Sequence, residues 1–240
     1  MECAFAQAYE ALYHEHWWWR AREEMLVELL RERQPKGGWR SILDVGCGNG
    51  LFFDRLEEFG KVEGVESCPE IVTGDSRHAA RIRIAPFDAS FQPGRRYGLI
   101  LLLDILEHLD KPAEALRHAL SLLAANGLIV ITLPAFPVLW TSHDALNHHR
   151  ARFTRSSFRA VATAAGMRIL ADRYFFHWIF PARLAMRAVE KVWETKPRIP
   201  RVPPHWLNRA LWRISRAEQR LFRKAPLPFG SSLLVLGARQ

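Results

Sequence analysis

The stretch ILDVGCGNG, residues 42–50, decides the fold of this 240-residue chain. It begins as a short apolar strand and continues into a glycine turn, and the segment after it, GLFFDRLEEFG, has the pattern of a helix. This order is typical of a nucleotide-binding turn, because glycines admit a ligand close to the backbone and a helix start offers free N–H groups. The spacing is G-x-G-x-G, however, and Leu51 stands where a dinucleotide-binding turn has its third glycine.

Three acidic residues lie at the ends of predicted strands, where ligands of open α/β sheets bind. Asp44 precedes the turn and suits a cationic group better than a pyrophosphate, which favours S-adenosyl-L-methionine (SAM), whose amino group needs an acceptor. Glu66 ends the predicted strand KVEGVES and can accept from both ribose hydroxyls. Asp88 follows a third predicted strand, in RIRIAPFDA, and can accept from the adenine amino group. The three acids together favour SAM over a dinucleotide.

Strand and helix patterns alternate along most of the chain. Residues 9–33 predict a helix with one apolar side, and YGLILLLDIL predicts a central parallel strand covered on both faces. Further along, KPAEALRHALSLLAANG predicts a helix, LIVITLPA a strand, TRSSFRAVATAAG a helix, and MRILADRYFF and SSLLVLGAR two more strands. The alternation predicts an α/β fold with helices on both faces of a parallel sheet.

Composition and charge bear on location and partners. No apolar run reaches the ~20 residues that span a bilayer, and the N-terminal stretch lacks the pattern of a secretory signal. Cys3, Cys47 and Cys68 show no CxxC spacing, which predicts reduced thiols and a cytoplasmic protein. Residues 1–149 hold 15 Lys+Arg against 21 Asp+Glu, whereas residues 150–240 hold 19 against 4. The basic second half predicts an anionic partner: a membrane surface, a phosphorylated substrate or a nucleic acid.

The motif series ILDVGCGNG, Glu66, FDA and LDILEHLDKP resembles that of the class I SAM-dependent methyltransferases, over roughly residues 9–176 and the last strand. The resemblance implies SAM as cofactor and a Rossmann-like, seven-stranded sheet whose last strand, SSLLVLGAR, inserts antiparallel. It also implies a set of cofactor-binding residues. These are Asp44, Gly46, Cys47 and Gly48 for the methionine part, Glu66 for the ribose, Asp88 and Ala89 for the adenine, and Asp104 beside the site. Glu107 and His108 follow Asp104, either as supporting residues of the site or as helix caps.

Two more stretches are similar to motifs of a bacterial subgroup of this family. HWWWRAR, residues 16–22, is similar to HWWF-x-AR, with Trp19 in place of the phenylalanine. PAFPVLWTSHDALNHHRARF, residues 134–153, is similar to P-AF-x-x-LWS-x-HD…H-x-RRY, with Thr141 inserted and a different ending. Either His148 or His149 therefore matches the motif's histidine, and the spacing from Asp144 favours His149.

The second of these stretches lies just past the fifth predicted strand, where an acceptor should enter. A histidine beside a carboxylate is a reasonable general-base pair for an acceptor that must lose a proton. His143, Asp144 and His149 are therefore the candidate catalytic residues, and the structural alternative is that they tie the rim together. We expect no metal among them, since adjacent His-Asp and His-His pairs do not easily converge from one regular element.

The tryptophans of HWWWRAR need an explanation, because they lie outside any predicted core strand. The N-terminal helix of this fold commonly covers the cofactor cleft, so we expect Trp17, Trp18 and Trp19 to roof the SAM site in part and exclude water. Arg22 is then expected to meet the methionine carboxylate, which makes Trp18 and Arg22 further cofactor-binding candidates. In the structural alternative the rings only pack the helix onto the sheet.

Residues 177–229 interrupt the alternation with two predicted amphipathic helices, PARLAMRAVEKVWE and PHWLNRALWRISRAEQRLFRK. Basic helices of this kind can lie in a membrane interface, bind a phosphate or carboxylate of a small substrate, or follow a nucleic-acid backbone. Nucleic acid is the weaker choice, as no RNA-binding motif is visible. In the structural alternative, an apolar stripe packs the second helix onto the body. Its residues are Leu207, Leu211, Ile214 and Leu221.

We therefore expect a single methyltransferase domain over residues 1–240. Its parts are an N-terminal helical lid (1–38), a SAM-binding core (39–176), a basic helical insertion or cap (177–229) and the last core strand (230–240). The favoured function is methyl transfer from SAM to a small, hydrophobic or lipid-like acceptor, in the cytoplasm or at the inner face of the membrane. The alternatives are a dinucleotide-dependent oxidoreductase and a non-catalytic, membrane-associated protein that retains the fold.

Overall fold

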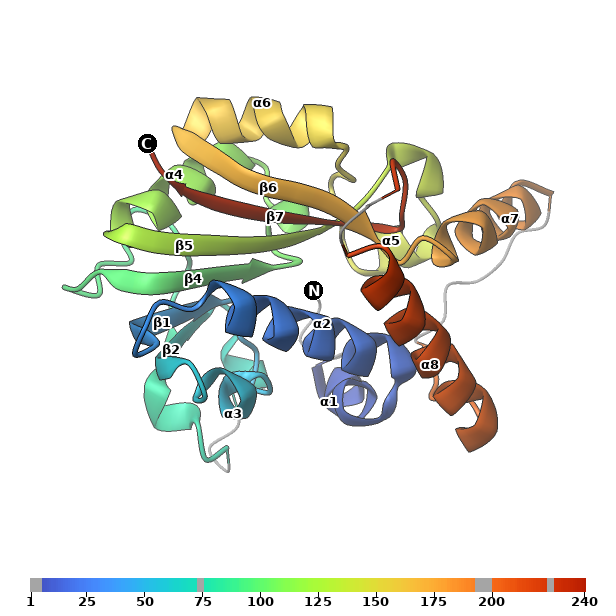
Figure 1. Cartoon of the computed structure of the whole chain (residues 1–240), viewed down its shortest axis with the longest axis horizontal. Helices are drawn as coiled ribbons and strands as arrows, with labels where there is room; N and C mark the ends of the chain where they lie inside the picture. Colours follow the sequence, from blue (N-terminus) through green and yellow to red (C-terminus); the bar gives the residue numbers. More distant parts are fainter. Residues whose placement is uncertain (1–5, 73–75, 193–199, 224–226) are drawn as a thin grey trace.

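The structure, a computed structural model, describes residues 6–72, 76–192, 200–223 and 227–240. At its centre lies a seven-stranded sheet of order β3-β2-β1-β4-β5-β7-β6 (Figure 1). Its strands are β1 (Trp39–Val45), β2 (Gly60–Glu66), β3 (Ile82–Ile84), β4 (Tyr97–Leu103), β5 (Leu123–Pro134), β6 (Met167–Phe175) and β7 (Ser232–Arg239). Neighbouring strands pair in parallel, except that β7 runs antiparallel to both β5 and β6. The predicted Rossmann-like sheet with an antiparallel last strand is confirmed.

Helices cover both faces of the sheet, as the alternation predicts. On one face, α2 (Trp17–Arg33) packs Met25, Leu26 and Leu30 against strand residues, beside α3 (Phe53–Leu56). On the other face lie α4 (Pro112–Leu122) and α6 (Arg155–Ala165), where Leu116 and Phe158 are fully buried. The central strands are apolar throughout because both of their faces are covered.

Several element boundaries differ from the predicted ones. The N-terminal helix is two helices, α1 (Ala6–Glu15) and α2, because His16 is extended and its Nδ1 accepts from the backbone N–H of Trp18 as an N-cap. Helix α4 ends at Leu122, since Leu123 already pairs with Tyr97 in the sheet. The third strand shrinks to three residues.

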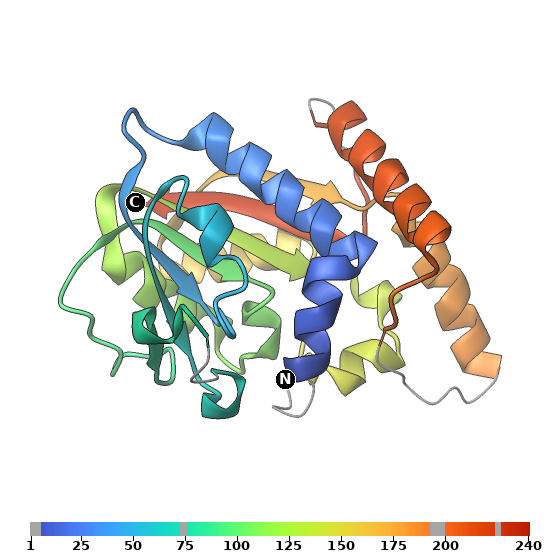
Figure 2. The same ribbon diagram turned by 90° about the horizontal axis from the view of Figure 1, so that it is seen from below.

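The insertion forms the two predicted helices, α7 (Ile179–Val192) and α8 (His205–Leu221). Helix α8 lies alongside α2, and both insertion helices project from the end of the sheet where β6 ends (Figure 2). The apolar stripe expected in the structural alternative holds α8 on the body only in part: Leu207 and Leu211 are half-buried and Trp212 packs against the core, whereas Ile214 is 49% exposed and Leu221 is 71% exposed. The buried side chains of α8 are instead polar ones: Asn208, Ser215, Arg216 and Glu218.

These polar side chains bind specific partners on the body. Arg216 forms ion pairs with Glu24 and Glu28 of α2. Glu218 accepts hydrogen bonds from the backbone N–H groups of His177 (2.9 Å) and Trp178 (2.8 Å). Within the described residues, no helix is both long enough and apolar enough to cross a membrane.

Asn208 joins α8 to the break between α1 and α2. Its Oδ1 accepts from the backbone N–H of Trp17 (2.8 Å), and its Nδ2 donates to the carbonyl of Glu15 (2.8 Å). Asn208→Ala would leave both part-buried backbone groups without this partner, so we expect it to lower the free energy of unfolding by about 1 kcal/mol in urea denaturation. The exposed neighbour Arg209 provides the control, because Arg209→Ala should change stability by less than about 0.5 kcal/mol. Equal losses of unfolding free energy in the two variants would show that the Asn208 hydrogen bonds do not stabilise the contact between α8 and the α1–α2 break.

Candidate active site at the carboxyl edge of the sheet

The carboxyl ends of β1, β2, β4, β5 and β6 share one edge of the sheet, and the backbone along this edge is strained. Asp104, Phe136 and Phe176 come directly or almost directly after β4, β5 and β6, and each has a left-handed φ of 57–58°. A non-glycine residue in this region costs about 1–3 kcal/mol, and such residues cluster where function requires a fixed geometry. The strain marks the same edge as the strand-end acids.

The glycine turn closes against the end of β2. Gly46 and Gly48 have φ values of 68° and 56°, which glycine adopts without steric cost. A Cβ on Gly46 would lie 2.1 Å from Cδ1 of Ile105, so the residue is also needed for close packing. The N–H of Gly48 donates to Oε2 of Glu66 (2.9 Å), and Oε1 of Glu66 accepts from the N–H groups of Ser67 and Cys68. These bonds place the predicted ribose carboxylate beside the turn.

Asp44 is a buried acid at the end of β1. Burial, with the nearby charge of Glu66 and despite that of Arg22, raises the pKa of Asp44 to about 7. No donor in the described part of the chain hydrogen-bonds to its carboxylate. A buried carboxylate without donors suits a cationic ligand group, so the residue fits the amino group of SAM.

Arg22 reaches from α2 to the same edge. Its Nη2 donates to Oδ2 of Asp104 (2.5 Å) and to Oγ1 of Thr132 (2.8 Å), while its Nε is buried without a hydrogen-bond partner. The guanidinium lies over the ring of Trp18, and that ring stacks on Phe176 with a centroid separation of 5.6 Å. Arg22, Trp18 and Asp104 therefore lie together at this edge, and the arginine, which was expected to meet the methionine carboxylate, is bonded to Asp104.

Other residues of the predicted cofactor set lie at or near the periphery. Asp88 and Ala89 are exposed, and the Asp88 carboxylate accepts from both the N–H and the hydroxyl of Ser90. Cys47 is a free thiol whose pKa is raised by burial. Cys68 is disulfide-bonded, so the prediction of reduced thiols is wrong for this residue, and Cys3 lies outside the described residues.

Asp144 organises the segment after β5, in the short helix α5 (Ser142–Leu146). Its carboxylate has no exposed surface and accepts from Nδ1 of His149 (2.8 Å), Nε of Arg152 (2.8 Å) and the N–H of Thr141 (2.9 Å). Burial alone would raise the pKa of Asp144, but the bonds from His149 and the Arg152 charge hold it below its usual range. An ionised Asp144 fixes the His149 tautomer with its proton on Nδ1, which leaves Nε2 as a free acceptor.

His143 is placed differently from His149. Its Nε2 lies 3.1 Å from Nδ2 of Asn147, the residue that caps the end of this short helix. Burial, together with the charge of Arg183, lowers the pKa of His143 to about 4. The structure therefore pairs Asp144 with His149, whereas the His143 ring is bonded to the Asn147 side chain.

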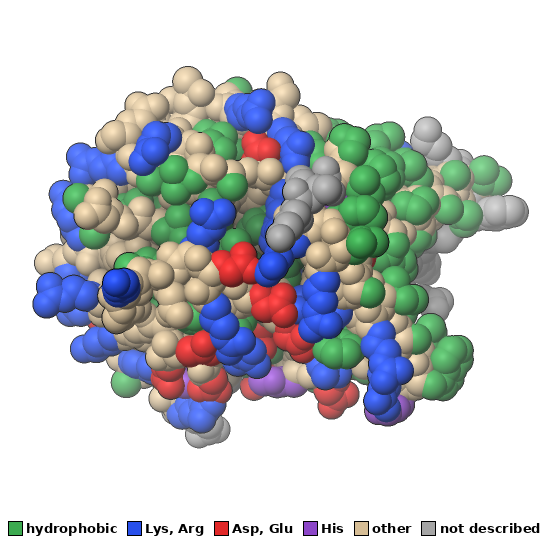
Figure 3. Space-filling model, in the orientation of Figure 1, with side chains coloured by type: hydrophobic (Ala, Val, Ile, Leu, Met, Phe, Trp, Pro, Cys, Tyr) green, Lys and Arg blue, Asp and Glu red, His purple; other side chains and the backbone are tan. Residues whose placement is uncertain are grey.

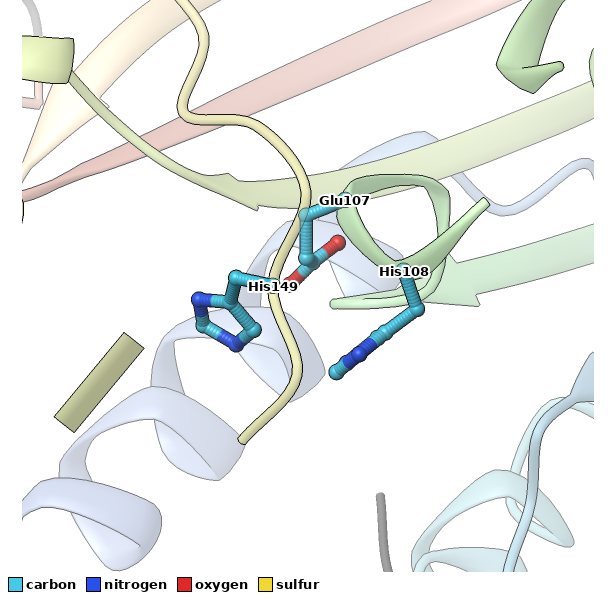
Figure 4. Close-up of side chains that lie close together, drawn as sticks. All are labelled: Glu107, His108 and His149. Carbon is cyan, nitrogen blue, oxygen red and sulfur yellow. The ribbon is translucent and has the colours of Figure 1, made fainter. Parts of the chain in front are cut away.

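Two residues beyond the predicted catalytic set lie beside His149. Glu107 and His108, in the turn after β4, share a small space with the His149 ring (Figure 4). Glu107 is fully buried with neither carboxylate oxygen hydrogen-bonded, and burial and Asp104 raise its pKa well above the usual value. Their place directly after a central apolar strand is the sequence signal for them, but their nearness to His149 follows only from the fold.

Comparisons with known proteins agree with this geometry. Residues 15–172 match the family described as "Methyltransferase domain". A ubiquinone biosynthesis O-methyltransferase of Caulobacter sp. (strain K31) is 30% identical over 121 residues, which are 46% of this chain and 48% of that protein. The mitochondrial enzyme of the same name from Schizosaccharomyces pombe is 24% identical over 120 residues, 46% of this chain and 43% of its own. The chain thus matches about half the length of these curated relatives.

Solved structures share the fold across nearly the whole chain. A methyltransferase solved with the Haloferax volcanii Trm112 methyltransferase activator has a TM-score of 0.59 and 15% identity, covering 98% of this chain and 94% of that one. A SAM-dependent methyltransferase from Archaeoglobus fulgidus has a TM-score of 0.56 and 17% identity, covering 90% and 93%. The chain belongs to the methyltransferase-domain family, and its sheet has the Rossmann-like fold of class I methyltransferases.

Proposed function

We propose that the protein transfers the methyl group of SAM to a hydroxyl of a small, hydrophobic acceptor. The observation that carries this proposal is the Asp144–His149 pair at the same sheet edge as the glycine turn. The relatives named as O-methyltransferases of ubiquinone biosynthesis support an oxygen acceptor. Labelled SAM offered with hydroxylated aromatic compounds, each with and without a hydrocarbon tail, tests the proposal. Label should enter the tailed hydroxyl compounds most efficiently.

In this proposal the chain's own residues bind SAM, orient the acceptor and remove the proton of its hydroxyl. Asp44 accepts from the amino group of SAM, and Arg22 offers its unpaired Nε to the carboxylate of the methionine part. Glu66 holds the ribose, and Asp88 with Ala89 borders the adenine. Trp18, stacked between Arg22 and Phe176, keeps water from the sulfonium. His149 faces the acceptor with Nε2 and takes its proton, while Asp144 holds the ring in place.

The role of Asp44 predicts a pH dependence of cofactor binding. A cationic amino group favours the ionised carboxylate, so the complex has a lower Asp44 pKa than the free protein, where it is about 7. Binding should therefore be tightest above pH 7 and weaken as the pH falls through 7, by up to about tenfold per unit. Isothermal titration with S-adenosylhomocysteine at pH 6, 7 and 8 measures this.

Other titratable groups lie near Asp44, so the pH dependence must be assigned to Asp44 with control variants. Arg22 and Glu66 act on its charge, and Asp44 itself acts on the buried Tyr13 and Cys47. Asp44→Asn should bind S-adenosylhomocysteine more weakly and remove the pH dependence, whereas Glu114→Gln on the exposed start of α4 should behave as wild type. Equal affinity at the three pH values would exclude Asp44 as the partner of the amino group.

The proposed role of His149 predicts a selective loss of turnover. His149→Gln keeps a polar side chain of similar reach but removes the imidazole, so kcat should fall by about 10²–10⁴-fold. The affinity for S-adenosylhomocysteine should stay within about twofold of wild type. His205→Gln, at the exposed first residue of α8, serves as the matched control. A fully active His149→Gln would reject the assignment.

We further propose that the acceptor is reached at an anionic membrane surface, through the insertion. Helix α7 has the opposite polarity to that of an ordinary surface helix. Its polar groups face the body: Arg187 donates to the carbonyls of Pro137 and Val138, and Glu190 accepts from the N–H and hydroxyl of Ser142. Among the α7 side chains that the structure describes, the exposed ones are apolar, and the large ones are Leu184, Met186, Val189 and Val192. Figure 3 shows hydrophobic side chains gathered over this part of the molecule.

Helix α8 adds positive charge to this surface. Exposed apolar residues, Trp206, Ile214 and Leu221, lie on the same helix as the exposed arginines Arg209, Arg213 and Arg220. Binding to a membrane interface has two components. Apolar side chains enter the interface, and neighbouring arginines bind the lipid phosphates. The charge favours an anionic membrane over an uncharged apolar partner.

Point variants test the membrane proposal without removing α8, which is bonded to α2. Wild type should sediment with phosphatidylglycerol-containing vesicles, less with phosphatidylcholine alone, and less at high salt. Met186→Gln with Val189→Gln should lower this binding at least tenfold. Leu170→Gln, an exposed apolar residue on β6, is the matched control and should bind as wild type. Vesicle binding that is unchanged in the α7 double variant would reject this surface.

A further inference from the structure

We propose that Glu107, His108 and His149 form a binding site for a divalent transition-metal ion, of which Zn²⁺ is the test case. One ligand atom from each residue can be chosen such that all three lie within 4.8 Å of one another. Figure 4 shows the three side chains converging from the turn after β4 and from the loop before α6. Two imidazoles and one carboxylate are a common ligand set for catalytic Zn²⁺, with a further position open to substrate or water.

Each histidine presents one free nitrogen because its other nitrogen is already bonded. Nδ1 of His149 is held by Asp144, which leaves Nε2 for a ligand. His108 is hydrogen-bonded to the backbone of His148, and its Nδ1 is buried without a partner. Histidines that bind metals typically have the other ring nitrogen fixed by a carboxylate or a backbone carbonyl, and both forms occur here.

Glu107 supplies an independent observation that points to a cation as ligand. Its side chain is completely buried, and both carboxylate oxygens have no hydrogen-bond partner in the described structure. An unsatisfied buried carboxyl is costly, and a metal ion would satisfy both the charge and the lone pairs. The two sides of the site are tied together, as Arg150 donates from its backbone to the Glu107 carbonyl (2.7 Å) and from Nε to the His108 carbonyl (3.0 Å).

The spacing requires only a small adjustment. Ligands at about 2.1 Å from a tetrahedral ion lie about 3.4 Å from one another, so side-chain rotations would draw the three atoms inward. The expectation of no metal considered only residues 143–149. The fold supplies Glu107 and His108 from a different segment.

The proposed metal binding rests on this geometry alone, whereas a role of the metal in methyl transfer rests on the proposed function. A bound ion would accept a lone pair of the acceptor hydroxyl and lower its pKa, so that its proton leaves to solvent. In the metal-bound protein His149 is then a ligand, and this replaces the base role that the proposed function gives to its Nε2. The oxygen then forms a bond to the methyl carbon. The carbon–sulfur bond breaks with its electron pair on sulfur, which yields S-adenosylhomocysteine.

The test is direct metal binding to chelator-stripped protein. Titration with ZnCl₂ against a chromophoric chelator should show one tight site per chain, and CoCl₂ should give visible absorption bands of a low-coordinate imidazole site. Glu107→Gln and His149→Gln should each weaken Zn²⁺ binding at least tenfold. Methyl transfer by the stripped protein should fall and return with added Zn²⁺.

One control variant excludes the other cluster of potential ligands. Asp54, Glu57 and His78 also lie close together, but Asp54 and Glu57 are already ion-paired with Arg77 and Arg81. His78→Gln should therefore leave Zn²⁺ binding unchanged. S-adenosylhomocysteine titration of the same samples reports the cofactor site separately, so loss of metal binding with intact cofactor binding identifies the metal ligands and not a folding defect.

The results that overturn the inference are specific. No stoichiometric Zn²⁺ binding, or binding that survives Glu107→Gln and His149→Gln, would reject the site itself. Full methyl transfer by the stripped protein in excess chelator would reject its part in catalysis and leave His149 as the base. Absence of S-adenosylhomocysteine binding would instead contradict the proposed function. The Zn²⁺ titration does not depend on cofactor binding and tests the metal site by itself.

Discussion

The arrangement of the acceptor side depends on one buried carboxylate, that of Asp144. Its two oxygens accept from the His149 ring, the Arg152 guanidinium and the backbone of Thr141, and Arg152 in turn donates to the carbonyl of Ala135, directly after β5. Removing a partner from a buried pair of this kind leaves an uncompensated charge, which costs about 3–5 kcal/mol. The loop from β5 to α6 is therefore fixed to the sheet by the same group that orients His149.

In the insertion, the amphipathic sequence pattern of the helices does not predict which side chains contact the body. An amphipathic helix normally buries its apolar face, because burial of apolar area is the main stabilising contribution. Here α8 is joined to the body through Asn208, Arg216 and Glu218, and α7 through Arg187 and Glu190. The apolar area that these helices leave in water is a cost to the isolated chain, and a lipid surface would recover it.

The sheet, its order and its glycine turn follow from the sequence because parallel strands covered on both faces must be apolar and each must end before a turn. Asp44, Glu66 and Asp104 could be placed at one edge for the same reason. The approach of Glu107 and His108 to His149 depends on a loop that folds back and pairs Ala135 with Phe153, which no periodic pattern encodes. The polar inner face of α8 was equally hidden, because helical spacing alone does not say which side meets the body.

Helix α2 connects helix α8 of the insertion with the ends of strands β6 and β4. Its first residue is bonded to Asn208 of α8, its second stacks on Phe176 after β6, and its sixth is paired with Asp104 after β4. The Trp17 ring also packs against Trp178 at 5.3 Å, at the start of the insertion. A displacement of α8 relative to the sheet must therefore either carry the start of α2 with it or break bonds to part-buried backbone groups. Since Arg22 lies only five residues from that start, such a displacement would also change the contact that covers the edge where Asp44 and Asp104 lie.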